Sequence, residues 1–219
     1  EKLFKMWYIA EPVGLFGPEP VGASGDNPTC YAISQDGIHW EKPLVGTLQA
    51  RGGAKHNAIL YATHLPSVTK DRSEPDLAKR YKMICWVTLP KESRGYRTMV
   101  SPDGIHWAFH SPKPFCPGAD VVTGYWDERR KLWVALAKIL TDIRGHRRRV
   151  FYLTTSRDFN QWSEPVLALY PDFADDAGAL ARIEQVRAAL DVPDDSAVMH
   201  TDFYGVGFHP TPTCVLGFP

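Results

Sequence analysis

Ser101-Pro102-Asp103-Gly104-Ile105-His106-Trp107 is a heptad that the chain uses three times. Residues 34–40 repeat it almost unchanged, and residues 156–162 form a more divergent copy, so that all three fit Ser-x-Asp-x-x-x-Trp. The copies begin 67 and 55 residues apart. These spacings are too long for helical solenoid repeats, and they suit a four-stranded propeller blade with long loops.

Apolar and aromatic runs around the heptads predict strands. One order of elements recurs: a strand, a polar turn, an apolar strand that opens with Lys, and a strand that ends in the heptad. The strands are expected at residues 3–10, 29–34, 56–65, 80–89, 94–101, 121–126, 131–140, 150–156, 197–208 and 213–218. The recurrence predicts an all-β fold, a β-propeller of antiparallel four-stranded blades.

The same order of elements divides the chain into repeat units within one propeller domain, residues 1–219. The units are expected at about 1–50, 51–117, 118–172 and 197–219. The first unit lacks an opening strand and the last stops after two strands, so the chain is expected to begin and end in mid-blade, as part of a longer propeller. Residues 176–190 interrupt the pattern, because Leu180, Ile183, Val186 and Leu190 recur at helical spacing. They predict one inserted amphipathic helix.

Charge and composition narrow the classes of partner. Lys+Arg and Asp+Glu both number 25, so the formal net charge is zero and no nucleic-acid partner is expected. The basic run at 144–149 is interpreted as a solvated hairpin tip. No apolar run has the length of a membrane span, and no signal peptide is visible in this chain. A secreted or periplasmic location stays open, as does the oligomeric state.

Cofactor and metal motifs are not found in the sequence. No Gly-rich phosphate loop precedes a helix, so no cofactor is expected. The four cysteines form no Cys-x-x-Cys pair, and one disulfide is conceivable but cannot be assigned. A metal site of His56 and His200 with Asp120 or Asp202 is disfavoured, because no closely spaced His pair supports it.

The heptad itself is interpreted as scaffold. An Asp after a strand can accept hydrogen bonds from backbone N–H groups of the following turn, and the Trp can pack between neighbouring blades. Three copies cannot all lie at one active site. The residues assigned to the structural blade motif are therefore Asp36, Trp40, Asp103, Trp107, Asp158 and Trp162.

The heptad and a downstream Pro resemble the blade-end motif of five-bladed propeller glycoside hydrolases, especially families 32 and 43. The heptad also looks like a shortened sialidase Asp-box, although Arg51, Arg97 and Arg149 are not placed as a sialidase arginine triad. Residues 119–134 resemble the Arg-Asp-Pro region of family 32, and residues 200–204 stand where that family carries its Glu-Cys-Pro-Asp segment. The resemblance implies five blades and three carboxylates that meet at the propeller axis.

The resemblance also gives expectations for the site, because inner strands of a propeller start beside the axis. Asp120 matches the transition-state stabiliser by position, and Asp202 replaces the acid Glu of the family. The nucleophile Asp of the family has no counterpart in this chain. Asp120 and Asp202 are the expected catalytic residues, and the expected substrate-binding residues are His56, Asn57, His200 and Tyr204. Each has an alternative: Asp120 can cap a turn, and His56 and His200 can be satisfied core histidines.

The function expected from these residues is hydrolysis of a glycosidic bond of a saccharide in the axial pocket, by carboxylate acid and base catalysis. The expected partner is a carbohydrate substrate. The alternative is a non-catalytic propeller of the same descent that binds a glycan or a protein partner. Whether a third carboxylate reaches the axis distinguishes the two.

Overall fold

The computed structural model describes residues 2–10, 28–61, 63–88, 94–118, 120–195, 199–211 and 213–218. Within these ranges the strands form four antiparallel sheets. The first sheet has the order β1 (Phe4–Ile9), β2 (Thr29–Ser34) and β3 (Ala58–Leu60). The second has the order β4 (Thr63–Lys70), β5 (Tyr81–Val87), β6 (Gly95–Ser101) and β7 (Ala108–Phe109). The third has β8 (Val122–Asp127), β9 (Leu132–Ile143), β10 (His146–Ser156) and β11 (Val166–Leu169), and the fourth has β12 (Gly207–Pro210) and β13 (Val215–Phe218).

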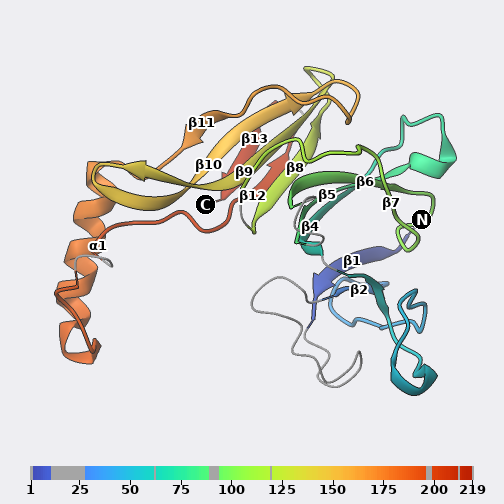
Figure 1. The fold of residues 1–219 in the computed structure, drawn as a ribbon, viewed down its shortest axis with the longest axis horizontal. Coiled ribbons are helices and arrows are strands. Elements are labelled where there is room, and N and C mark those ends of the chain that lie inside the picture. Colours follow the sequence, from blue (N-terminus) through green and yellow to red (C-terminus); the bar gives the residue numbers. More distant parts are fainter. Residues whose placement is uncertain are drawn as a thin grey trace.

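The sheets follow one another as the blades of a propeller. β4 packs beside β1 and β8, and β8 also packs beside β12, so the first strands of the second, third and fourth sheets are neighbours. Ser67 on β4 and Gly124 on β8 are joined by hydrogen bonds of 3.0 and 3.3 Å. Figure 1 shows the resulting arc from β1 and β2 through β4–β7 to β8–β11. The prediction of an all-β propeller of antiparallel blades is confirmed.

Each heptad forms one compact turn after β2, β6 or β10, which we call the heptad turn. Asp103 Oδ1 accepts hydrogen bonds from the backbone N–H groups of Ile105 and His106, at 2.8 and 2.9 Å. Asp36 and Asp158 accept the corresponding pairs in the other two turns. Gly104 has φ +85°, a left-handed conformation that favours glycine.

Heptad turns pack against the preceding sheet. Trp7 on β1 donates a hydrogen bond from Nε1 to the Gly104 carbonyl in the second sheet, at 2.7 Å. Trp107 packs edge-on against Trp7, with ring centroids 6.4 Å apart. In the third turn, Trp162 stacks on Phe115 of the second sheet at 4.5 Å. The tryptophans of the second and third turns therefore join neighbouring blades.

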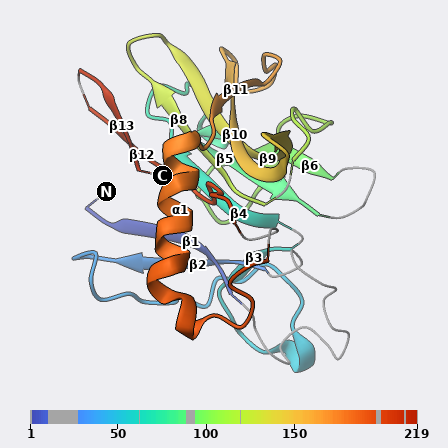
Figure 2. The same cartoon turned by 90° about the vertical axis from the view of Figure 1, so that its left-hand side faces the viewer.

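A helix, α1 (Phe173–Val186), follows β11 and continues as a short 3-10 helix, Arg187–Ala189. Asp172 caps its N-terminus, because its side chain accepts hydrogen bonds from the N–H groups of Ala174 and Asp175. The predicted helix therefore exists and starts three residues earlier than expected. Figure 2 shows α1 in front of the sheets, and Figure 1 shows that it stands apart from them beyond the β9–β10 hairpin. In the described part of the chain, no helix is both long and apolar enough to cross a membrane.

Two strand predictions are wrong. Residues 56–65 do not form one strand: β3 ends at Leu60 in the first sheet, and β4 begins at Thr63 in the second. Residues 199–206 are not in a strand, and the first strand of the fourth sheet begins only at Gly207. In both cases a strand boundary lies inside a continuous run of apolar and aromatic residues, and the pattern of the run does not show it.

The four cysteines are free, and their environments differ. Burial raises the pKa of Cys85 and of Cys116 to about 12, and it also raises the pKa of Cys30. Cys214 is exposed. Since the thiolate is the reactive form, we expect one thiol to react rapidly with Ellman's reagent in the native protein at mildly alkaline pH. All four should react in denaturant, and rapid reaction of two or more native thiols would contradict this packing.

Candidate functional site

Asp120 lies two residues before β8, in a strained segment of backbone. Its φ is +88°, which is uncommon for a residue other than glycine, and such strain is concentrated at functional sites. The backbone next to Asp120 is held by Tyr96, whose hydroxyl lies 2.8 Å from the carbonyls of both Val121 and Lys138 and shares its single proton between them. Gly118 is required here, because a Cβ at this position would lie 2.3 Å from the Tyr96 ring.

The Asp120 carboxylate is held by three side chains from three different parts of the fold. Lys138 Nζ on β9 donates to Oδ2 at 2.5 Å, and the Tyr204 hydroxyl donates to the same oxygen at 3.0 Å. His64 Nε2 on β4 lies 2.7 Å from Oδ1. This last contact has the distance of an ion pair but not the direction of a hydrogen bond. We call His64, Asp120, Lys138 and Tyr204 the Asp120 cluster.

Asp120 is held in its ionised form by this cluster. Burial opposes the charge, but the hydrogen bond and the positive charge of Lys138, with the Tyr204 hydroxyl and His64, outweigh it and lower the pKa of Asp120 below its ordinary value. The Asp120 side chain is 20% exposed. A carboxylate that is both charged and accessible can face a ligand.

His64 reaches Asp120 through an irregularity in β4. The pairing of β4 with β5 shifts between His64 and Ser67, and Leu65 has φ +43°. Irregularities of this kind re-aim side chains and are frequent beside active sites. The ring of His64 packs edge-on against Trp86 at 6.1 Å, and its Nδ1 is buried with no hydrogen-bond partner among the described residues. Two left-handed residues, Leu65 on β4 and Asp120 just before β8, therefore lie at this contact.

Tyr204 covers the cluster. Lys138 Nζ lies 3.8 Å from the centroid of its ring, and the Arg149 guanidinium carbon lies 5.7 Å from it. The hydrogen bond to Asp120, then burial, raises the pKa of Tyr204 above its ordinary value. The tyrosine is therefore a hydroxyl donor to Asp120, with 58% of its surface exposed.

Asp202 is close to this cluster, but it is engaged by Arg149. Its Oδ1 accepts a hydrogen bond from the Arg149 backbone N–H at 2.9 Å, and its Oδ2 accepts one from the guanidinium at 2.8 Å. Asp202 and Asp120 share no hydrogen-bond partner among their contacts. The expectation that Asp202 opens an inner strand is wrong, because it lies five residues before β12.

His200 lies beside Asp202, with Nε2 3.7 Å from Oδ1, and its ring stacks on His146 with centroids 4.7 Å apart. The side chain is only 11% exposed, and Nδ1 is buried with no hydrogen-bond partner in the described ranges. His200 is therefore placed near Asp202 and Arg149. Of the residues expected in the 200–204 segment, only Tyr204 contacts Asp120.

His56 and Asn57 lie in the first sheet and make structural contacts there. His56 Nε2 is 2.9 Å from the Leu48 carbonyl, and its Nδ1 accepts the backbone N–H of Ala58 at 3.1 Å. Asn57 Nδ2 donates to the Tyr8 hydroxyl and to the Tyr31 carbonyl, both at 2.8 Å. These contacts join β3 to β1 and β2, and a role in binding substrate stays a prediction.

The sequence did not indicate His64 and Lys138. His64 lies inside the run that was interpreted as one strand from residue 56, so its position at a strand start was hidden. Lys138 is buried within an apolar strand, with a side chain 4% exposed. A buried Lys requires a partner, so a lone Lys in an apolar run was the available signal for Lys138. In the ranges that the structure describes, no three His, Cys, Asp or Glu side chains are grouped as metal ligands.

No family model matches the sequence, and no curated protein matches it either. Solved structures of similar fold include a fructofuranosidase from Schwanniomyces occidentalis complexed with fructose, at 12% identity and TM-score 0.47, covering 76% of this chain and 32% of that one. Fructan 1-exohydrolase IIa from Cichorium intybus matches at 15% identity and TM-score 0.47, and the match covers 75% of this chain and 30% of that one. An N-acetylgalactosamine deacetylase from F. plautii, in complex with blood group B trisaccharide, matches at 18% identity and TM-score 0.41. This match covers 68% of this chain and 47% of that one. Glycoside hydrolases are therefore among its structural neighbours, and the chain spans less than half the length of each of these three.

Proposed function

We propose that this chain carries part of the active site of a propeller glycoside hydrolase similar to families 32 and 43. The observation that supports this most is Asp120, an ionised and accessible carboxylate on a strained residue at the start of a first strand. Glycosidic hydrolysis passes through a transition state with positive charge on the sugar ring. A fixed negative charge beside that ring stabilises the transition state more than the ground state.

The other members of the Asp120 cluster position this charge. Lys138 and Tyr204 both donate to Oδ2, so this oxygen is fixed, whereas Oδ1 is buried and has no hydrogen-bond partner among the described residues. Since Oδ1 is buried and the side chain as a whole is 20% exposed, we assign the Oδ2 side of the carboxylate to the sugar, either to its hydroxyls or to the developing charge. His64, which touches Oδ1, limits the direction of approach.

A general acid is the second group that the reaction requires. Asp202 is the proposed residue, as the sequence predicts. It can donate a proton to a leaving oxygen only after Arg149 has released one of its two carboxylate oxygens. The proposal therefore includes a movement of the Arg149 side chain, which is 44% exposed.

One observation favours the second candidate, a propeller that binds a glycan without cleaving it. Within the part of the chain that the structure describes, the side chains that contact Asp120 are His64, Lys138 and Tyr204, and none of them is a carboxylate. In that case the Asp120 cluster would bind sugar hydroxyls, and the chain would bind saccharides that it leaves intact.

A screen of aryl glycosides with the 219-residue chain tests the proposal, with Asp120→Asn as the inactive variant. Release of the aryl alcohol by the wild-type protein, and not by the variant, is the expected result. Saccharide binding without release would support the second candidate. A chain that neither cleaves nor binds any saccharide of the screen would overturn both.

The pH dependence of hydrolysis should depend on Lys138. The ionised Asp120 is lost as pH falls through its pKa, and Lys138 contributes to keeping this pKa low. Replacing Lys138 with Met removes the positive charge, so the pKa of Asp120 rises and the acid limb of the kcat profile moves to higher pH. Lys131→Met, which removes an exposed Lys immediately before the same strand, is the control. An acid limb that Lys138→Met leaves in place would show that Asp120 is not the titrating group.

A further inference from the structure

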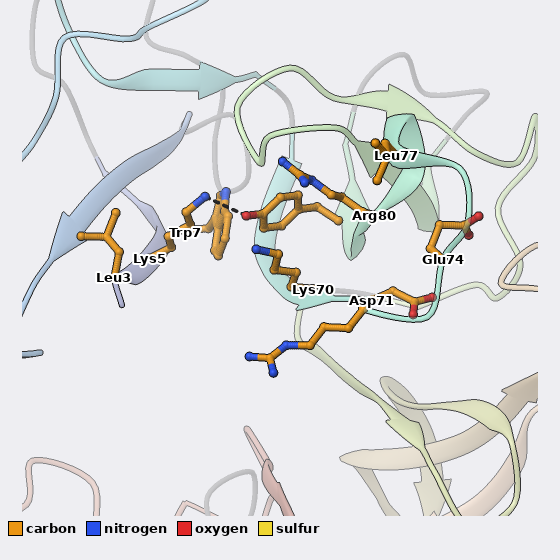
Figure 3. Close-up of a pocket in the computed structure, with 10 residues that line it drawn as sticks. Leu3, Lys5, Trp7, Lys70, Asp71, Glu74, Leu77 and Arg80 are labelled. Carbon is orange, nitrogen blue, oxygen red and sulfur yellow. Dashed lines mark hydrogen bonds between the residues drawn. The ribbon is translucent and has the colours of Figure 1, made fainter. Parts of the chain in front are cut away.

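A pocket of about 510 Å³ lies between the first and second sheets, away from the Asp120 cluster. Its walls come from β1, from the end of β4 with the residues after it, and from the start of β5. Figure 3 shows its lining, with Lys5 and Trp7 on one side and Lys70 and Arg80 on the other.

The pocket carries an excess of positive charge. Four cationic side chains line it, against two carboxylates, Asp71 and Glu74. Glu74 is paired with a cation outside the lining, because Lys82 Nζ donates to its Oε2 at 2.6 Å, and this hydrogen bond lowers the pKa of Glu74. Asp71 Oδ1 accepts both the backbone N–H and the hydroxyl of Ser73. The four cations are Lys5, Lys70, Arg72 and Arg80.

Three of these cations converge on one ring. Lys5 Nζ, Lys70 Nζ and the Arg80 guanidinium carbon lie 4.8, 5.4 and 5.8 Å from the centroid of Tyr81. Tyr81 is 1% exposed, so it is a rigid base for them. Lys5 Nζ donates to its hydroxyl at 2.7 Å, and Arg80 Nε donates to the Pro102 carbonyl at 2.6 Å. These two hydrogen bonds fix the positions of the Lys5 ammonium and the Arg80 guanidinium. The hydrogen bond from Arg80 to Pro102 is made by Nε.

Apolar side chains complete the lining. Leu3, Trp7 and Leu77 stand beside the cations, and Leu77 is 67% exposed. A volume of about 510 Å³ exceeds that of a single tetrahedral oxyanion and is in the range of small-molecule sites. The pocket therefore has room for an anionic group and for an organic group attached to it.

This pocket is distinct from the Asp120 cluster. Lys70 is the last residue of β4, whereas His64, which contacts Asp120, is near its beginning. A rise of 3.2–3.4 Å per residue separates the two ends of such a strand by roughly 20 Å. A ligand in the pocket would thus lie at the opposite end of β4.

We propose that this pocket binds an organic phosphate or sulfate monoester. The oxyanion contacts Lys5, Lys70 and Arg80, since clustered cations with fixed positions form charge-assisted hydrogen bonds to such oxygens. The organic group lies against Trp7 and Leu77. This site does not depend on the proposed hydrolysis, because it shares no residue with the Asp120 cluster.

Isothermal titration calorimetry with phenyl phosphate, phenyl sulfate and phenol, at constant ionic strength, tests the site. We expect saturable binding of at least one of the two esters and none of phenol. Lys70→Gln changes an exposed residue among the three cations assigned to the oxyanion, and we expect it to weaken binding by roughly tenfold. Lys113→Gln, which removes an exposed cation in the segment between β7 and β8, should leave the affinity unchanged.

The two esters distinguish the sources of the anion. Tighter binding of phenyl phosphate assigns the site to phosphate esters, and tighter binding of phenyl sulfate assigns it to sulfate esters. The proposal fails if neither ester gives saturable heat, if phenol binds as tightly, or if Lys70→Gln and Lys113→Gln weaken binding equally. A thermal melt of each variant separates a lost contact from a lost fold.

Discussion

Replacing Asp120 with Asn is expected to lower kcat/KM for any glycoside that the chain hydrolyses by about a thousandfold, the scale of losing one electrostatic stabiliser of a transition state. Asn has almost the same shape as Asp and tolerates the left-handed conformation better than most residues. The substitution therefore removes the negative charge without forcing the backbone at φ +88° to change. Steady-state kinetics of the purified variant would measure the loss.

The control for this variant is Asp191→Asn, because Asp191 is exposed. It should keep full activity. Asp120→Asn also leaves Lys138 buried beside a neutral amide, so a lower midpoint of thermal unfolding is expected as well. Activity should therefore be compared at a temperature at which both proteins are folded. Full activity of folded Asp120→Asn would remove Asp120 from the mechanism.

Replacing Arg148 with Met is expected to lower the free energy of unfolding by about 3 kcal/mol, the lower end of the cost of breaking a buried ion pair. The Arg148 side chain is 1% exposed and donates two hydrogen bonds to the carboxylate of Asp176, at 2.6 and 2.9 Å. It also donates to the carbonyls of Ile143 and Thr201. Since Asp176 is 19% exposed, water can partly replace the lost contacts. Urea unfolding would measure the change.

Arg144→Met is the matched control, since Arg144 donates to the same carboxylate with a single hydrogen bond of 2.8 Å and is 21% exposed. We expect it to cost about 1 kcal/mol. Asp176→Asn should cost less on top of Arg148→Met than alone, because the two residues act as a pair. Equal losses for Arg144→Met and Arg148→Met would contradict the assignment of Arg148 as the main anchor of α1.

Much of the fold could be predicted from the sequence because the residues of the heptad determine the geometry of their own turn. An Asp two residues after the Ser, with Gly next in two of the copies, specifies a turn whose hydrogen bonds are all local. A turn of this kind can be predicted from the sequence without knowledge of the tertiary contacts around it. The end of β3 at Leu60, the start of β4 at Thr63 and the irregular residues 199–206 could not be predicted in this way, because the apolar pattern continues across these boundaries.

The candidate site was less accessible to prediction than the fold. Asp120 was indicated by its place before a predicted strand, and Tyr204 by its place in the segment of residues 200–204. The contact of His64 with Asp120 depends on a pairing irregularity in β4 and on a left-handed Leu65, neither of which has a sequence signature. Lys138 contacts Asp120 from a strand whose pattern predicts only burial. Contacts between sheets are decided by tertiary structure, and local patterns do not record them.

The packing of the second and third heptad turns on structure earlier in the chain has a consequence for biosynthesis. The Gly104 turn docks on Trp7, and Trp162 docks on Phe115, so in both cases the receiving surface is earlier in the chain. A ribosome releases the chain from its N-terminus, and the surface that each turn requires is therefore exposed before the turn itself. The blades of this propeller can be assembled in the order of translation, each on a template that already exists.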